Sequence, residues 1–169
     1  MESHDHDFMY LALAAASEAS KREEVPVGAV IVCNGAVIAT GYNCREERQN
    51  PLAHAEIVAI QGASATLRSW RLDQCDIYVT LEPCVMCVGA ILQARLRRLV
   101  FGCLDPKAGA VETLYRLCED QRLNHQLVAT GGVLAEESSS LLSAFFSRLR
   151  AQKRDSQRTG RWPSPVGGA

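Results

Sequence analysis

The sequence predicts an α/β domain of three layers, α/β/α, in which a mixed sheet of about five strands lies between helices on both faces. Two observations predict this fold class. A hairpin opens the sheet, and short apolar runs then alternate with segments of helical length and periodicity. The 169 residues contain no internal repeat and no boundary that indicates a second domain.

Composition limits the class of protein further. The chain is 47% hydrophobic and has a net charge of −1, so residues 1–151 are expected to form one folded domain. After Ala151 the composition becomes polar, which predicts a disordered tail over residues 152–169. No apolar run approaches the roughly 18 residues of a membrane span, and no basic leader follows Met1. We therefore expect a cytoplasmic protein without membrane contact.

The first third of the chain predicts one helix and a hairpin. Asp5 or Asp7 can cap a helix whose apolar residues recur at i, i+3 and i+4 and which ends near Lys21. Asn34-Gly35 is a strong hairpin turn between two apolar runs. These runs are the first two predicted strands, residues 28–32 and 36–42.

The remaining elements follow from apolar runs and helix boundaries. Further strands are predicted over residues 76–80, 99–102 and 126–130. Further helices are predicted from Pro51 to Gly62, from Cys84 through Leu92, from about Glu112 to Cys118, and from Glu136 to Arg150.

Two short motifs carry the chemistry. His54 and Glu56 form an H-x-E motif, and Cys84 and Cys87 follow about thirty residues later as P-C-x-x-C. One imidazole and two thiolates suit Zn²⁺, and three protein ligands leave a fourth position open, as in catalytic sites. Because both motifs begin helices, the zinc is expected at the helix N-termini, where the partial positive charge favours thiolates.

Glu56 is the predicted catalytic acid/base. Zn²⁺ lowers the pKa of a bound water toward 7, and a nearby carboxylate that does not bind the metal can move its proton. Such a site can attack an aromatic carbon that carries an amine, which leaves as ammonia. The sequence therefore predicts hydrolytic deamination of a nucleobase.

The other cysteines have no ligand spacing and are expected to be buried or loop thiols. The chain has seven, and these five are Cys33, Cys44, Cys75, Cys103 and Cys118.

Charge is unevenly distributed. From Arg148 to Arg161 six cations stand against one anion, and Arg95, Arg97 and Arg98 form a second cluster. Clustered cations can follow a phosphate backbone, but a solvated helix face and a basic tail would have the same composition.

The chain resembles the bacterial tRNA-specific adenosine deaminases, a family within the cytidine-deaminase-like superfamily, from about Phe8 to Arg150. The zinc motifs alone indicate only the superfamily. Asn43, the loop after Phe101-Gly102 and the helix with Phe145-Phe146 narrow the resemblance to the tRNA enzymes. The segments that carry the resemblance are Val25–Val30, Asn43, Ala53–Glu56, Thr80–Cys87 and Phe101-Gly102, with Asp105 and Lys107.

The resemblance implies a cytidine-deaminase-like fold, a homodimer with one zinc per subunit, and wobble adenosine of a tRNA anticodon loop as substrate, with inosine as product. It implies that Asn43 hydrogen-bonds the flipped base, although an Asn at a strand end also suits a turn. Ala55, Asp105 and Lys107 are expected beside the nucleotide. Phe145 and Phe146 match a helix that holds the RNA loop, but their spacing equally fits core burial. Pro106 and Leu104 depart from the family pattern.

Two other functions share these features. A deaminase of a free base or nucleotide, such as guanine or cytosine, would use the same four site residues but would have no use for the cations around Arg148. A non-catalytic RNA-binding subunit with a structural zinc would not need Glu56.

Overall fold

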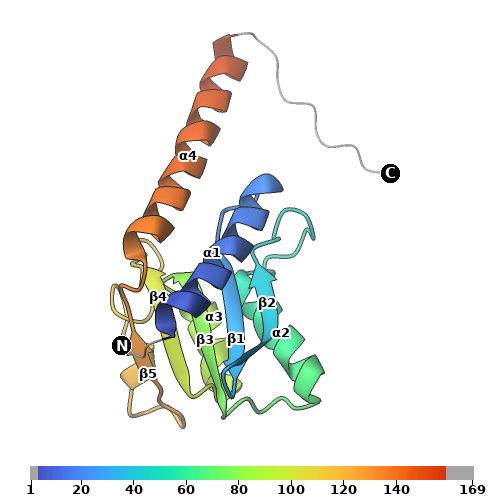
Figure 1. Cartoon of the computed structure of the whole chain (residues 1–169). Helices are drawn as coiled ribbons and strands as arrows, with labels where there is room; N and C mark the ends of the chain where they lie inside the picture. The colour runs from blue at the N-terminus through green and yellow to red at the C-terminus, as the bar shows by residue number, and fades with distance from the viewer. Residues whose placement is uncertain (1–3, 159–169) are drawn as a thin grey trace.

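The computed structural model describes residues 4–158 and has a mixed sheet of five strands (Figure 1). The strands are β1 Gly28–Cys33, β2 Ala36–Tyr42, β3 Cys75–Leu81, β4 Arg98–Cys103 and β5 Val128–Thr130. Their order is β2-β1-β3-β4-β5; β1 pairs antiparallel with β2 and β3, and β3, β4 and β5 run parallel. The predicted fold class is confirmed.

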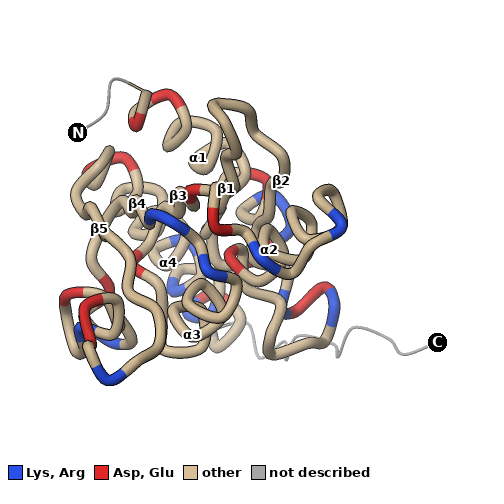
Figure 2. Tube along the Cα trace, turned by 90° about the horizontal axis from the view of Figure 1, so that it is seen from below, with Lys and Arg blue, Asp and Glu red and all other residues tan. Residues whose placement is uncertain are grey.

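Helices cover both faces of this sheet. They are α1 Asp5–Lys21, α2 Ala55–Leu67, α3 Val85–Gln93 and α4 Ala135–Arg158, with a short 3-10 helix at Leu117–Glu119. Viewed along the strands, α1 lies on one face, and α2 and α3 lie on the other (Figure 2). The helix α4 begins beside β4 and extends away from the body (Figure 1).

Alternation along the strands produces two cores, one on each face of the sheet. Val30 and Tyr78 belong to the core under α1, whereas their neighbours Ile31 and Ile77 belong to the core under α2 and α3. Because both faces of β1 and β3 are buried, these strands have continuous apolar runs.

A buried ion pair connects α1 to the sheet. Both carboxylate oxygens of Asp5 accept hydrogen bonds from the Arg98 guanidinium, at 2.9 and 2.7 Å, and the Tyr78 hydroxyl donates a third at 3.1 Å. Asp5 is fully buried, and the cap position of α1 is His4. The predicted capping role of Asp5 or Asp7 is therefore wrong, because both lie within the first turn of α1 and the Asp5 carboxylate faces the sheet rather than the helix end.

Three predicted helix boundaries are also wrong. The helix α2 begins at Ala55 and not at Pro51, because residues 51–52 form a turn and His54 is the N-cap residue. The helix α2 continues through Gly62 to Leu67, and Arg68 ends it in a left-handed conformation (φ 51°). Helix α4 does not end at Arg150 but continues to Arg158. The polar residues after Ala151 are mostly good helix formers without an interrupting glycine or proline, so the helix propagates. Of the predicted disordered tail, residues 152–158 are helical, and the others lie outside the described residues.

The predicted helix from Glu112 to Cys118 is absent. The backbone N–H groups of Val111, Glu112 and Thr113 donate to the carboxylate of Glu82, and the Leu117 N–H bonds to the Ala110 carbonyl oxygen rather than to the carbonyl four residues before it. The segment is built from turns, followed by the 3-10 helix.

Within residues 4–158, no helix is both long enough and apolar enough to cross a membrane.

Removal of the buried guanidinium tests how far the fold depends on the Asp5–Arg98 pair. Arg98→Ala leaves a carboxylate buried without its cation, so we expect the free energy of unfolding to fall by about 3–5 kcal/mol, measured by urea titration. The control is Arg71→Ala, which breaks an exposed pair with Asp73 and is expected to cost less than about 1 kcal/mol. An Arg98→Ala loss as small as that of the control would contradict this prediction.

Candidate metal centre and base pocket

The candidate metal centre lies where two helices begin. His54 is the N-cap residue of α2, Cys84 is the N-cap residue of α3, and Cys87 lies in the first turn of α3. His54 has an extended backbone (φ −77°, ψ 154°), so it is not part of the regular helix that carries Glu56. This removes the angular separation of about 200° that two helical residues at i and i+2 would have.

A glycine allows α2 to start this close to the sheet. A Cβ atom on Gly41 of β2 would lie 2.2 Å from the Ala55 carbonyl oxygen and 2.7 Å from the Ala59 nitrogen. Neither distance is sterically possible, so any side chain at Gly41 would displace the first turn of α2. The position of His54 and Glu56 therefore depends on this close approach.

The distances within the cluster fit a tetrahedral zinc ion. His54 Nδ1 lies 3.8 Å from Cys84 Sγ and 3.5 Å from Cys87 Sγ, and the three ligand atoms lie within 4.8 Å of one another. Zn–N bonds of about 2.0 Å and Zn–S bonds of about 2.3 Å at tetrahedral angles place N and S about 3.5 Å apart. The donor set and its spacing thus suit zinc without rearrangement.

The hydrogen bonds within the cluster favour a thiolate at Cys84. A hydrogen bond from Cys87 lowers the pKa of Cys84 to about 4 against the effect of burial, and a bond from His54 adds to this shift. The same contacts raise the pKa values of His54 and Cys87. Protons on His54 and Cys87 thus surround one thiolate, and a bound dication can take their place.

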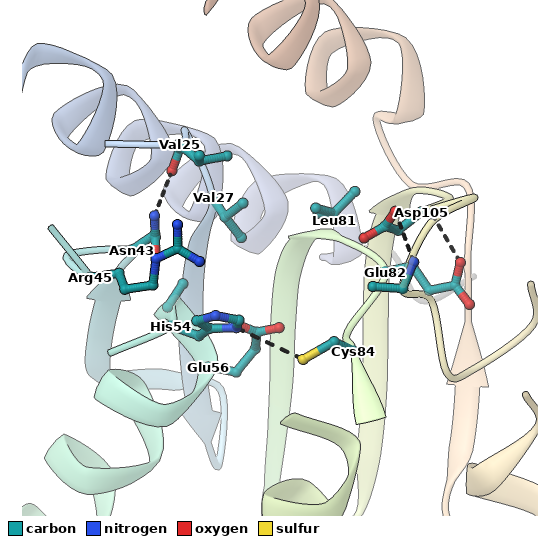
Figure 3. Close-up of a pocket in the computed structure, with 12 residues that line it drawn as sticks. Val25, Val27, Asn43, Arg45, His54, Glu56, Leu81, Glu82, Cys84 and Asp105 are labelled. Atoms are coloured by element: carbon teal, nitrogen blue, oxygen red, sulfur yellow. Dashed lines mark hydrogen bonds between the residues drawn. The ribbon is translucent and has the colours of Figure 1, made fainter. Parts of the chain in front are cut away.

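Glu56 lies beside the cluster without belonging to it. Glu56 is 4% exposed, its carboxylate contacts Cys87, and burial raises its pKa. It faces the same pocket as His54 and Cys84 (Figure 3). This is the position of a group that can move a proton near the metal.

The pocket has a volume of about 190 Å³ and opens above the cluster. Three of the predicted substrate-binding residues, Asn43, Ala55 and Asp105, line it. Six further residues that were not predicted to bind substrate also line the pocket: Val25, Val27, Arg45, Leu81, Glu82 and Ala108. Of these, Arg45 could have been predicted to lie near the substrate, because it follows Asn43 by two residues on the same loop.

Three other predicted residues do not line this pocket. Lys107 and Phe146 line an adjoining groove that shares Val25, Leu81 and Asp105 with it. Phe145 lines neither and is buried at 6% exposure, in edge-to-face contact with Phe146. Successive residues of a helix point in different directions, so Phe145 points inward and Phe146 points to the groove. Phe145 is therefore buried in the protein and does not line the groove.

Glu82 holds the loop that borders the pocket. Its carboxylate accepts hydrogen bonds from the backbone N–H groups of Asp105, Val111, Glu112 and Thr113, and from the Thr113 hydroxyl. Burial raises its pKa, but these hydrogen bonds outweigh burial, so the net pKa lies below its usual value. Glu82 precedes the P-C-x-x-C motif in the sequence, but its role in holding this loop depends on contacts with residues that are distant in the chain.

Metal content tests the centre. Cys87→Ala removes a ligand atom and is expected to purify with less than about a tenth of the zinc of the unchanged protein, measured by mass spectrometry of the metal. The matched control is Cys33→Ala, which removes a half-buried thiol outside the cluster and should retain full zinc. Full zinc in Cys87→Ala would exclude this ligand set.

Comparison with known proteins identifies the family. Residues 2–103 match the model of the cytidine and deoxycytidylate deaminase zinc-binding region. The tRNA-specific adenosine deaminase of Bacillus subtilis is 46% identical over 150 residues, covering 89% of this chain and 93% of that protein. The tRNA-specific adenosine deaminase of Haemophilus influenzae is 44% identical over 151 residues, covering 89% of this chain and 87% of that protein.

Solved structures of two kinds of deaminase share the fold. One comes from studies of A-to-I editing by tRNA:A34 deaminases at the wobble position of transfer RNA; it has a TM-score of 0.78 and 46% identity, and covers 80% of this chain and 99% of its own. A guanine deaminase from Bacillus subtilis has a TM-score of 0.57 and 32% identity, and covers 68% of this chain and 82% of its own. The matched zinc-binding region and the His/Cys/Cys cluster together identify the metal as zinc. This chain therefore belongs to the cytidine and deoxycytidylate deaminase zinc-binding family and, within it, to the tRNA-specific adenosine deaminases.

Proposed function

We propose that this protein removes the amino group of adenosine by hydrolysis at the wobble position of a tRNA anticodon loop, which converts adenosine to inosine. The observation that carries the proposal is the convergence of the His54, Cys84 and Cys87 cluster, the buried Glu56 and Asn43 on one small pocket. The similarity to tRNA-specific adenosine deaminases supports adenosine in tRNA as the substrate.

The roles of the site residues follow from their positions. His54 and the thiolates of Cys84 and Cys87 hold the zinc, which supplies hydroxide at neutral pH. Glu56 takes a proton beside the metal and passes it to the substrate, so that the amine leaves as ammonia. Asn43, on the pocket wall, orients the base.

The size of the pocket supports recognition of one extruded base. At about 190 Å³ it is smaller than the roughly 300 Å³ at which sites for drug-sized ligands begin, so the sugar and the flanking nucleotides would lie outside. A base in a single-stranded anticodon loop is extruded at lower cost than one in a duplex.

The surface beside the pocket suits RNA. The adjoining groove of about 590 Å³ contains Lys107, Phe146 and Arg150 and runs toward α4. Further along α4, Lys153 and Arg154 are exposed cations that can follow a phosphate backbone. We propose that the deaminase domain spans residues 1–151, as the sequence predicts, and that the exposed cations of α4 extend its RNA surface. A tRNA substrate is consistent with the expected cytoplasmic location.

A deamination assay tests the proposal. The substrate is an anticodon stem-loop with adenosine at the wobble position; the comparisons are the same stem-loop with adenosine moved by one nucleotide, free adenosine, guanine and cytosine. We expect inosine only at the wobble position. Glu56→Gln should retain zinc and lose about 10²–10⁴-fold in rate, because its amide cannot exchange a proton.

Two outcomes would contradict this function. Ammonia released from a free base, with the RNA unchanged, would indicate a salvage deaminase with the same metal chemistry. Near-normal turnover by Glu56→Gln would exclude the proposed proton transfer.

We also propose that the protein is a homodimer, as the family resemblance implies. Large apolar side chains stay exposed on the single chain, including Val85, Leu114 and Tyr115, and a second copy would cover such residues. Light scattering is expected to give twice the chain mass of 18.4 kDa. A mass of one chain at micromolar concentration would exclude a stable dimer.

A further inference from the structure

A buried carboxylate lies behind the wall of the base pocket. Glu24 follows the C-terminus of α1 and is only 2% exposed, and its backbone N–H donates to the Ala19 carbonyl oxygen at 3.0 Å. Its Oε2 accepts a hydrogen bond from Asn43 Nδ2 at 3.3 Å, and its Oε1 accepts one from the Glu47 N–H at 2.7 Å. Glu24 does not line the pocket, so it can influence the base only through a neighbour.

Asn43 is that neighbour. Its amide nitrogen lies between two acceptors, Glu24 Oε2 and the Val25 carbonyl oxygen at 3.4 Å. Figure 3 shows this nitrogen turned toward Val25 and away from the metal cluster. Both partners are hydrogen-bond acceptors, so the Asn43 atom that faces them must be the NH₂ nitrogen and not the carbonyl oxygen.

The carbonyl oxygen of Asn43 is then the atom left for the substrate. Within residues 4–158, Oδ1 has no hydrogen-bond partner, and it is not among the fully buried polar atoms left unsatisfied, so it keeps some exposure on a residue that lines the pocket. A fixed acceptor on this wall can bind a donor of the nucleoside. An amide free to rotate by 180° would present an acceptor or a donor and would select for neither.

We infer that Glu24 is a positioning residue for base recognition: its carboxylate fixes the amide of Asn43 with nitrogen inward and oxygen toward the substrate. This inference rests on the proposed function, because it deepens the recognition of the base in the same pocket. The second bond of Glu24, to the Glu47 N–H, holds the loop that follows Asn43 and keeps the carboxylate in place.

An isosteric substitution separates orientation from packing. In Glu24→Gln the side-chain oxygen can still accept from Glu47, but the new NH₂ group then faces the NH₂ group of Asn43. If the Asn43 amide turns over to avoid this contact, its oxygen meets the Val25 carbonyl oxygen, so no orientation satisfies all three groups. We expect kcat/KM for the RNA to fall about tenfold, which corresponds to about 1.4 kcal/mol, with zinc content unchanged and Tm lowered by only a few degrees, because one buried polar group is left unpaired.

A double-mutant cycle with Asn43→Ala shows whether Glu24 acts through Asn43. If it does, Glu24→Gln lowers kcat/KM in the Asn43 background but changes it by less than about twofold in the Asn43→Ala background. The matched control is Glu23→Gln, which removes an adjacent, exposed carboxylate and should leave kcat/KM unchanged. If Glu24→Gln does not fold, Glu24→Asp takes its place in the cycle, since it keeps the charge but withdraws the acceptor from Asn43.

Two results would overturn the inference. Equal losses in both backgrounds would show that Glu24 acts independently of Asn43, and no loss in the Asn43 background would show that it has no role in recognition. The cycle is measured on whichever base the unchanged protein deaminates. If the proposed function is wrong, the unchanged protein leaves the wobble adenosine intact. If only this inference is wrong, the protein deaminates the RNA but the effects of the two substitutions are additive.

Discussion

The structure depends on the meeting of two helix N-termini at one end of the sheet. His54 at the start of α2 and Cys84 at the start of α3 lie 3.8 Å apart at their ligand atoms, although thirty residues separate them. The unpaired N–H groups and partial positive charge of a helix start favour the thiolate that a metal needs. The metal centre is thus a consequence of how two crossover helices dock, and Gly41 sets the depth at which one of them docks.

Three buried glutamates around the pocket show how environment assigns different roles to one residue type. Glu82 is satisfied by backbone N–H groups and the Thr113 hydroxyl, so it remains a structural anion that holds a loop. Glu24 has two donors, from Asn43 and Glu47, and holds an amide. Glu56 is buried beside the cluster, and its pKa is raised by burial, which suits a group that must gain and lose a proton. Pocket chemistry of this kind depends on the count and type of neighbouring donors.

Local sequence signals predicted the central elements well because those elements are buried on both faces. The apolar runs of β1 and β3, and the Asn34-Gly35 turn between β1 and β2, leave few alternatives. Prediction failed where a distant side chain competes with local preference. Asp5 does not cap α1 because Arg98 pairs with it, and the segment after Val111 folds around the Glu82 carboxylate, with the Leu117 N–H bonded to the Ala110 carbonyl oxygen instead of within a helical turn. Gly62 was predicted to end α2, but packing of this helix against β1 and β2 carries it on to Leu67.

The sequence by itself determined the chemistry: one imidazole, two thiols and a carboxylate at a diagnostic spacing define a zinc deaminase, because ligand type and number select the metal and its open position. Only the tertiary structure decided which other residues reach the base. Asn43 and Arg45 lie on the loop after β2, whereas Asp105 lies on the loop after β4; Phe145 and Phe146 are adjacent in the chain yet point to the core and to the groove. The reason is physical: ligand identity is a property of residue types, whereas a pocket wall is formed by chain segments whose relative positions depend on packing of the whole sheet and its helices.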